Sequence, residues 1–296
     1  MSDATRSDLS GGPPRGLLAS LELDMRLLGM IGAFVLLALA FTVATGGTFL
    51  SPRNIFNITI QTVSVAIMAT GMVFIIVTRH IDLSVGSVLA MASAVMAMVQ
   101  ARWLPGYLGL EVGSPLIAPL TILAGLAVGT AIGAFHGWLA GYQGIPSFIV
   151  TLGGLLVWRN VSWYTTTGQT IAPLDSTILL FGGAEGVLGP ALSWVVAAVA
   201  SLFVVWAAWR RRQGRARHGF PVKPLWAEVT LTGLTVAAIV GFIAVLNANQ
   251  VPPARLAREF AARGETMPEG YTRGLGLPIS VLILIAVAVA MTLVAQ

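Results

Sequence analysis

Cysteine is absent from this 296-residue sequence, and lysine occurs once, at Lys223. Without cysteine the chain has no disulfide, no iron–sulfur cluster and no thiol chemistry. A Walker A loop needs a lysine directly before Ser or Thr to reach nucleotide phosphates, and Lys223 is followed by Pro224. The chain is therefore not expected to hydrolyse ATP by that route.

Patterns for metal binding and catalysis are missing as well. Three histidines and no cysteine leave too few ligands for a zinc-type site, so we expect no metal and no cofactor. The sequence has neither H-E-x-x-H nor G-x-S-x-G. Asp82, between two apolar runs, is the one aspartate that we expect within the membrane, whereas a paired-aspartate protease needs two and a proton relay usually needs several acids. We therefore expect that the chain is not an enzyme.

Charged residues are scarce. They make up 10% of the chain, against about 25% in soluble domains, while 56% of residues are hydrophobic and the mean hydropathy is +0.85. The net charge of +5 is no nucleic-acid signature, because the arginines lie mostly between apolar runs. The composition predicts an all-α, polytopic transmembrane helical bundle in a lipid bilayer.

About eight apolar runs approach the roughly 20 residues that cross a bilayer core. Residues 1–26 are polar and mixed in charge, and we expect a cytoplasmic tail there, followed by one transmembrane domain over 27–296. The predicted spans are 27–50, 55–78, 83–100, 116–140, 145–165, 188–209, 227–247 and the run from 277.

The basic connection 210–226 contains five arginines and Lys223. Cytoplasmic loops carry an excess of such residues, so this loop is predicted to be cytoplasmic. Counting back through alternating crossings places the amino terminus in the cytoplasm and the loop 248–276 in the periplasm.

The stretch 78–87 carries Arg79, His80 and Asp82 between two apolar runs. Ionisable groups within a membrane segment are costly and usually mark a pathway, a pair or a gate. Asp82 precedes Leu-Ser-Val-Gly-Ser in the manner of a helix N-cap, which favours a helix broken within the membrane over a polar surface loop. Pro146 and the polar end of the span 145–165 predict a second break there.

Five glycines in the fourth span are spaced four residues apart. This repeated GxxxG pattern predicts a close-packed seam against another helix, in this subunit or in a second copy, and not a substrate groove. His136 on the same helix is interpreted as a hydrogen-bonded buried histidine, not a ligand. The predicted helix-packing face comprises Gly125, Gly129, Gly133, Gly137 and Gly141.

Two segments, 72–90 with its I-D-L-S-V-G-S motif and 144–159 with G-I-P-S-F-I-V-T-L-G-G, carry a family resemblance. The chain resembles the permease subunits of ABC-type monosaccharide importers, within the branched-chain amino acid, ribose and xylose permease superfamily. Trp158-Arg159, the basic connection and the extra span after it most resemble the D-xylose branch.

The resemblance implies a permease of the bacterial inner membrane that moves a monosaccharide, D-xylose first, by alternating access. It also implies three kinds of partner: a cytoplasmic ATP-binding subunit, a periplasmic sugar-binding protein and a second permease copy in a homodimer. Members of the family continue past the last apolar run with a coupling segment and later spans, which we expect this 296-residue sequence to lack.

The candidate residues for the substrate pathway or gate are polar groups near the two predicted breaks. A second interpretation gives them structural roles, with Asp82 capping its helix and neutralising Arg79. Ribose or galactose as substrate, an ion-coupled secondary transporter, and a non-transporting membrane scaffold stay open as alternatives. The candidates are Arg79, Asp82, Ser84, Ser87, Ser147, Phe148, Thr151 and Arg159.

Overall fold

A computed structural model describes residues 25–182 and 185–294. All regular elements in these ranges are helices, accompanied by isolated β-bridges, which confirms the all-α prediction. The chain divides into two compact units: a first unit of residues 1–56 and 188–277, and a second unit of residues 57–187 and 278–296. The predicted tail falls outside the described residues up to residue 24, and the first described helix begins at Met25.

Within the described ranges, six helical stretches are long and apolar enough to cross a membrane, so the predicted count of about eight is not confirmed. Of the two remaining candidates, α7 (Ser147–Thr166) is less apolar and α12 (Ile279–Val294) has only 16 residues. The six are α2 (Met25–Ala44), α3 (Pro52–Val77), Val85–Leu108, α6 (Ile117–Gly141), α9 (Gly189–Arg217) and α10 (Leu225–Ala248).

The stretch Val85–Leu108 is one helical rod built of three parts. α4 (Val85–Met98) passes through a π-helical turn, η2 (Val99–Trp103), into α5 (Leu104–Leu108). The span predicted to end at residue 100 therefore continues to Leu108, and Gly109 ends it in a left-handed conformation with φ 66°.

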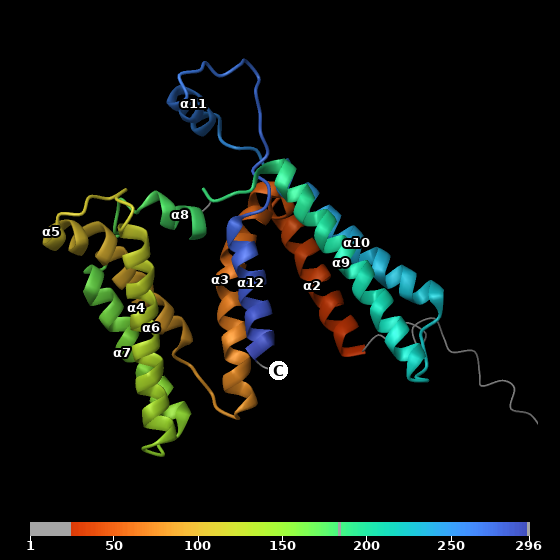
Figure 1. The fold of residues 1–296 in the computed structure, drawn as a ribbon, viewed down its shortest axis with the longest axis horizontal. Helices are drawn as coiled ribbons and strands as arrows, with labels where there is room; N and C mark the ends of the chain where they lie inside the picture. The colour runs from red at the N-terminus through yellow and green to blue at the C-terminus, as the bar shows by residue number, and fades with distance from the viewer. Residues whose placement is uncertain (1–24, 183–184, 295–296) are drawn as a thin grey trace, which may run out of the picture. The chain divides into compact units, whose positions relative to one another are not determined.

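The second unit is built around α4, which packs against both α6 and α7 (Figure 1). Two glycines bring helices of this unit close together, one between α4 and α6 and one between α6 and α7. A Cβ atom at Gly125 of α6 would lie 2.5 Å from the Met96 sulfur, and one at Gly154 of α7 would lie 2.5 Å from Cε1 of His136. The small residues thus let side chains of one helix reach the backbone of the next.

The predicted interruption at 78–87 is present, between the end of α3 at Val77 and the start of α4 at Val85. The α3 helix closes with a Schellman pattern, in which the His80 N–H donates to the Ile75 carbonyl at 3.0 Å. Arg79 takes the left-handed conformation, with φ 62°, a position that usually holds glycine. This conformation costs a non-glycine residue about 1 kcal/mol, so surrounding contacts must stabilise the connection.

The break predicted within 145–165 is wrong, because α7 is an unbroken helix over 20 residues. The interruption precedes it, where Gly144 has φ +66° and Pro146 occupies the cap position. Polar side chains inside α7 are satisfied by carbonyls of the preceding turn. Asn160 Nδ2 donates to the Leu156 carbonyl at 2.6 Å, so its presence does not require the helix to open.

Asp175 organises the loops at the other end of this unit. Its side chain is 2% exposed, and it accepts from the Gly113 N–H at 3.0 Å and from the Thr177 N–H at 2.9 Å. The Asp175 N–H in turn donates to buried Gln100 Oε1 at 2.8 Å. Asp175 therefore joins three parts of the unit: its carboxylate bonds the loop before α6 and the start of α8 (Ser176–Gly182), and its N–H bonds the π-helical turn.

The first unit contains the hairpin of α9 and α10, which run side by side in Figure 1. α9 is helical through Arg217, so the predicted basic loop 210–226 is helix in its first part. Near the turn, Arg212 Nη1 donates to Glu228 Oε2 at 2.5 Å and to the Lys223 carbonyl at 3.0 Å.

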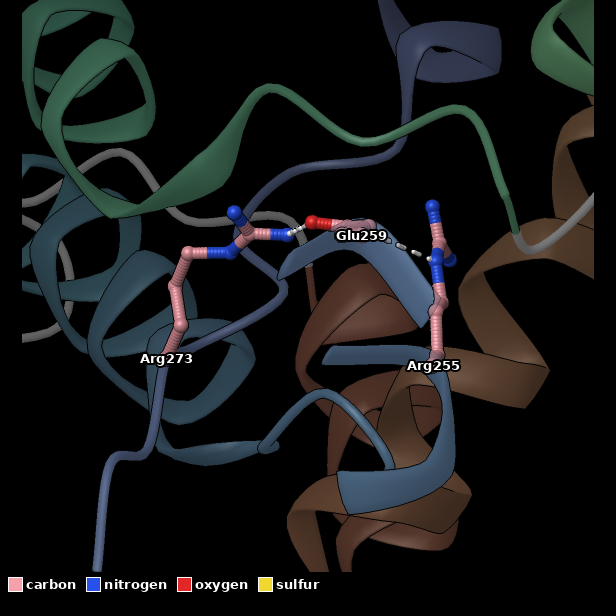
Figure 2. Close-up of polar contacts among 3 residues, drawn as sticks. All are labelled: Arg255, Glu259 and Arg273. Atoms are coloured by element: carbon pink, nitrogen blue, oxygen red, sulfur yellow. Dashed lines mark hydrogen bonds and ion pairs between the residues drawn. The ribbon is translucent and has the colours of Figure 1, made fainter. Parts of the chain in front are cut away.

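The predicted loop 248–276 contains an amphipathic helix, α11 (Pro253–Ala262), whose Leu256 is buried. Figure 2 shows Glu259 between two arginines, accepting from Arg255 Nε at 3.3 Å and from Arg273 Nη2 at 2.6 Å. The paired charges fix α11 against the returning chain, where the Val251 N–H donates to the Arg273 carbonyl at 2.8 Å.

We predict that Asp175→Ala lowers the stability of the protein by about 2 kcal/mol, because two N–H groups lose their buried acceptor. Thermal unfolding in detergent measures the change. Glu111→Ala removes an exposed acid from the same loop and is the control, with a change below about 0.5 kcal/mol. Equal unfolding temperatures for both variants would contradict the role given to Asp175.

Candidate functional site

A cavity of about 480 Å³ lies in the second unit, beside the connection 78–84. Ligand pockets commonly measure about 300–1,000 Å³ and combine apolar walls with a few convergent polar groups. The walls come from α3, α4, α6 and the start of α7, and most lining residues are apolar. The polar lining residues are Thr78, His80, Asp82, Ser84, His136, Ser147 and Thr151.

Three side chains of the cavity wall, Asp82, Ser84 and His136, form a hydrogen-bonded relay with Trp158. The indole N–H of Trp158 donates to His136 Nε2 at 3.0 Å, and His136 Nδ1 lies 3.3 Å from Ser84 Oγ. The Ser84 hydroxyl donates to Asp82 Oδ1 at 2.6 Å, and the Ser84 N–H donates to the same oxygen at 2.7 Å. We call Trp158, His136, Ser84 and Asp82 the relay.

The relay has a direction. Because His136 Nε2 accepts from the indole, we assign the proton of the neutral ring to Nδ1, which then donates to Ser84. Each hydrogen bond polarises the next, and the chain ends on the carboxylate of Asp82. Ser84 is fully buried, so the relay also satisfies a hydroxyl that would otherwise be costly to bury.

A second group of contacts holds the connection to the start of α7. Ser147 Oγ accepts from the Ile81 N–H at 3.3 Å and lies 3.2 Å from His80 Nδ1. Thr151 Oγ1 donates to the Ile81 carbonyl at 3.2 Å and to the Ser147 carbonyl at 2.9 Å. The relay and this group together fix residues 81–83, which belong to neither α3 nor α4.

The structure brings four of the eight candidate residues to the cavity: Asp82, Ser84, Ser147 and Thr151. The other four do not line it. Ser87 is buried and donates to the Ser84 carbonyl at 2.7 Å, and Phe148 is 48% exposed. Arg159 lines a separate hollow between α4 and α7, and Arg79 is exposed.

The second interpretation gave Asp82 two roles, capping its helix and neutralising Arg79, and the structure shows neither in that form. Its carboxylate accepts from the Ser84 N–H in a turn before α4, whereas Ser84 itself holds the N-cap position. Among the described residues, however, no ion pair joins Asp82 to Arg79. Asp82 therefore holds the turn that leads into α4 and does not neutralise the arginine.

The sequence pointed to neither His136 nor Trp158 as a member of this site. His136 was expected to be a hydrogen-bonded buried histidine. It is hydrogen-bonded but only half-buried, and its partners are separated from it by 22 and 52 residues. The glycine row could have indicated that His136 belongs to the site, because Gly133 and Gly137 lie near it on α6 and also line the cavity.

Of the five glycines in the row, one has a close neighbour on another helix in the described part of the chain. Gly125 meets Met96 of α4, whereas a Cβ at Gly129, Gly133, Gly137 or Gly141 would have no atom within 4 Å. The seam against another helix stays a prediction for that part of α6.

Residues 54–220 match the profile of the family described as "Branched-chain amino acid transport system / permease component". The chain belongs to this permease family. Both segments that carried the sequence resemblance, and all four relay residues, lie inside the matched range.

Individual relatives are sugar permeases by name. The xylose transport system permease protein XylH of Escherichia coli (strain K12) is 35% identical over 236 residues, which cover 79% of this chain and 57% of the relative. XylH of Haemophilus influenzae is 35% identical over 219 residues, covering 74% and 55%. The ribose import permease protein RbsC of Escherichia coli (strain K12) is 38% identical over 142 residues, covering 48% and 40%.

These findings confirm the sequence resemblance to monosaccharide permeases. The chain spans little more than half the length of the xylose relatives it matches. A comparison with solved structures gave no match. Membership of the permease family and the candidate spans make the chain a multi-pass protein of the inner membrane.

The cavity can be tested by thiol labelling, because the chain has no cysteine of its own. Gly133→Cys places a thiol on the cavity wall, while Ala134→Cys places one at the same depth of α6 but outside the lining. We predict that a charged, membrane-impermeant thiol reagent labels the Gly133 variant at least tenfold faster. Equal rates in native membranes would show that the cavity is not a water-accessible compartment.

Proposed function

We propose that the chain is the transmembrane permease subunit of an ATP-driven importer that moves a monosaccharide, with D-xylose as its substrate. The cavity and its relay are the observation on which this proposal rests, and the names of the relatives XylH and RbsC support the choice of a pentose. The cavity would be part of the path that alternates between the two sides of the membrane.

The chemistry of the cavity suits a polyhydroxylated solute. Sugar hydroxyls both donate and accept, and the Asp82 carboxylate is a strong acceptor of which only Oδ1 has a hydrogen-bond donor among the described residues. Ile75, Val88 and Leu89 supply apolar surface for the C–H faces of a ring. A transport pathway must also release its solute. A mostly apolar cavity with a few polar groups would bind a sugar weakly, which suits passage better than a site that binds it tightly.

The energy source would lie in a partner. The sequence has no Walker A pattern, so ATP would be hydrolysed by a cytoplasmic ATP-binding subunit that drives alternating access. A periplasmic sugar-binding protein would deliver the sugar, and a second permease copy would complete a homodimer. The basic end of α9, with Arg210 to Arg217, would face the cytoplasm together with the amino terminus.

Uptake of radiolabelled D-xylose tests this function. The chain is expressed with the ATP-binding subunit and the sugar-binding protein in cells that lack their own xylose permease. Uptake should require the chain, fall on ATP depletion at constant membrane potential, and persist when an uncoupler collapses the potential at constant ATP. The reverse dependence would indicate ion coupling, and absence of uptake with the chain in the membrane would contradict transport by this chain.

Two substitutions of Asp82 separate its charge from its hydrogen bond to the Ser84 N–H. Asparagine offers an oxygen in the same place, so Asp82→Asn keeps that hydrogen bond and removes the charge, while Asp82→Ala removes both. We predict that both variants lower D-xylose uptake at least tenfold at equal abundance in the membrane. Full uptake by Asp82→Asn would show that transport needs only the hydrogen bond from the Ser84 N–H and does not need the charge of Asp82.

A further inference from the structure

An apolar groove of about 460 Å³ runs between α9 and α10 in the first unit. Both helices are candidate membrane spans, so the groove lies at the height of the lipid hydrocarbon. Val205, Ala208, Val229 and Val236 are among its lining residues, and Gly233 leaves the α10 side open, with no atom within 4 Å of the position a Cβ would take.

The end of the groove nearest the helix turn is charged. Arg212 and Glu228 close it as a neutral pair, so neither offers a net charge. Trp209 also lines the groove and is 56% exposed, at the place in a membrane helix where aromatic side chains meet the headgroups. The groove therefore changes from hydrocarbon-like to polar within about one helix turn.

Beyond this end, α9 continues with uncompensated arginines. The 3.6-residue period of α9 puts Arg215 next to Ala208 around the helix and Arg211 at the edge of the same face, whereas Arg210 lies on the opposite face. Arg211 and Arg215 are exposed, and no hydrogen bond or ion pair involves their side chains among the described residues. Two free guanidinium groups thus stand over the mouth of an apolar groove.

We propose that this groove binds an anionic phospholipid, with one acyl chain between α9 and α10 and the headgroup phosphate at Arg211 and Arg215. Charge complementarity selects the lipid, because residues 210–228 contain six cationic side chains and one acid. Arginine is suited to phosphate because its planar fork donates two parallel hydrogen bonds. Basic pockets between membrane helices on the cytoplasmic side take anionic headgroups in this way.

Native mass spectrometry of the complete chain tests the site. The chain is released in mild detergent and titrated with phosphatidylglycerol or with phosphatidylcholine of the same acyl chains. We expect phosphatidylglycerol to bind at least fivefold more tightly. Equal affinities for the two lipids would overturn the proposal. Dimers that retain no phosphatidylglycerol would also overturn it, because a second copy of the chain would then cover the groove.

Matched variants locate the headgroup. Arg215→Gln should weaken phosphatidylglycerol binding about fivefold, the usual effect of one basic residue at a membrane surface. Arg210→Gln removes the same charge from the opposite face, where Arg210 stacks 4.9 Å from the centre of the Trp206 ring, and should change affinity less than twofold. Equal losses in the two variants would show a diffuse charge effect and contradict a defined site.

The acyl chain is tested separately. Gly233→Leu fills the groove, and leucine favours a helix more than glycine does, so folding should be retained. This variant should lose most of the preference for phosphatidylglycerol while its unfolding temperature does not fall. Unchanged binding, or displacement of the lipid by millimolar glycerol phosphate, would show a phosphate site without the groove and would overturn the proposal.

Discussion

The hydrogen bond from the Ser84 hydroxyl to Asp82 is the contact on which the organisation of the second unit depends. It lies in the connection between α3 and α4, which begins with Arg79 in the left-handed conformation. Residues 81–83 of this connection belong to neither helix, so contacts from other elements must hold them. Within the described residues, this connection is tied to α6 through His136 and to α7 through Ser147 and Thr151. The same contacts that make the interruption tolerable also supply the polar wall of the cavity.

This arrangement gives a membrane permease a polar surface at little cost. The relay residues come from different parts of the unit: Asp82 from the connection, Ser84 from the start of α4, His136 from α6 and Trp158 from α7. The two ionisable groups, Asp82 and His136, are therefore not carried by the same helix within its apolar length. The apolar part of the wall comes from α3 and α4. A sugar would meet one carboxylate oxygen and several hydroxyls there, enough to replace part of its hydration and few enough to let it leave.

The interruption could be predicted from the sequence, because Arg79, His80 and Asp82 stand out among apolar neighbours. The break assigned to 145–165 was wrong because polar side chains there, such as Asn160 and Thr165, bond to carbonyls of their own helix. Composition alone does not show that such bonds form. The relay could not be predicted from local patterns. His136 meets Trp158 only because Gly154 lets α7 approach α6, and that contact depends on helix packing.

A double-mutant cycle between Ser84→Ala and Trp158→Phe tests the relay most directly. The relay connects the two residues through His136. If His136 transmits polarisation between them, the loss of stability in the double variant should differ from the sum of the single losses by about 0.5 kcal/mol or more. Additive losses, within about 0.3 kcal/mol, would show two independent hydrogen bonds and contradict a relay that links α7 to the connection.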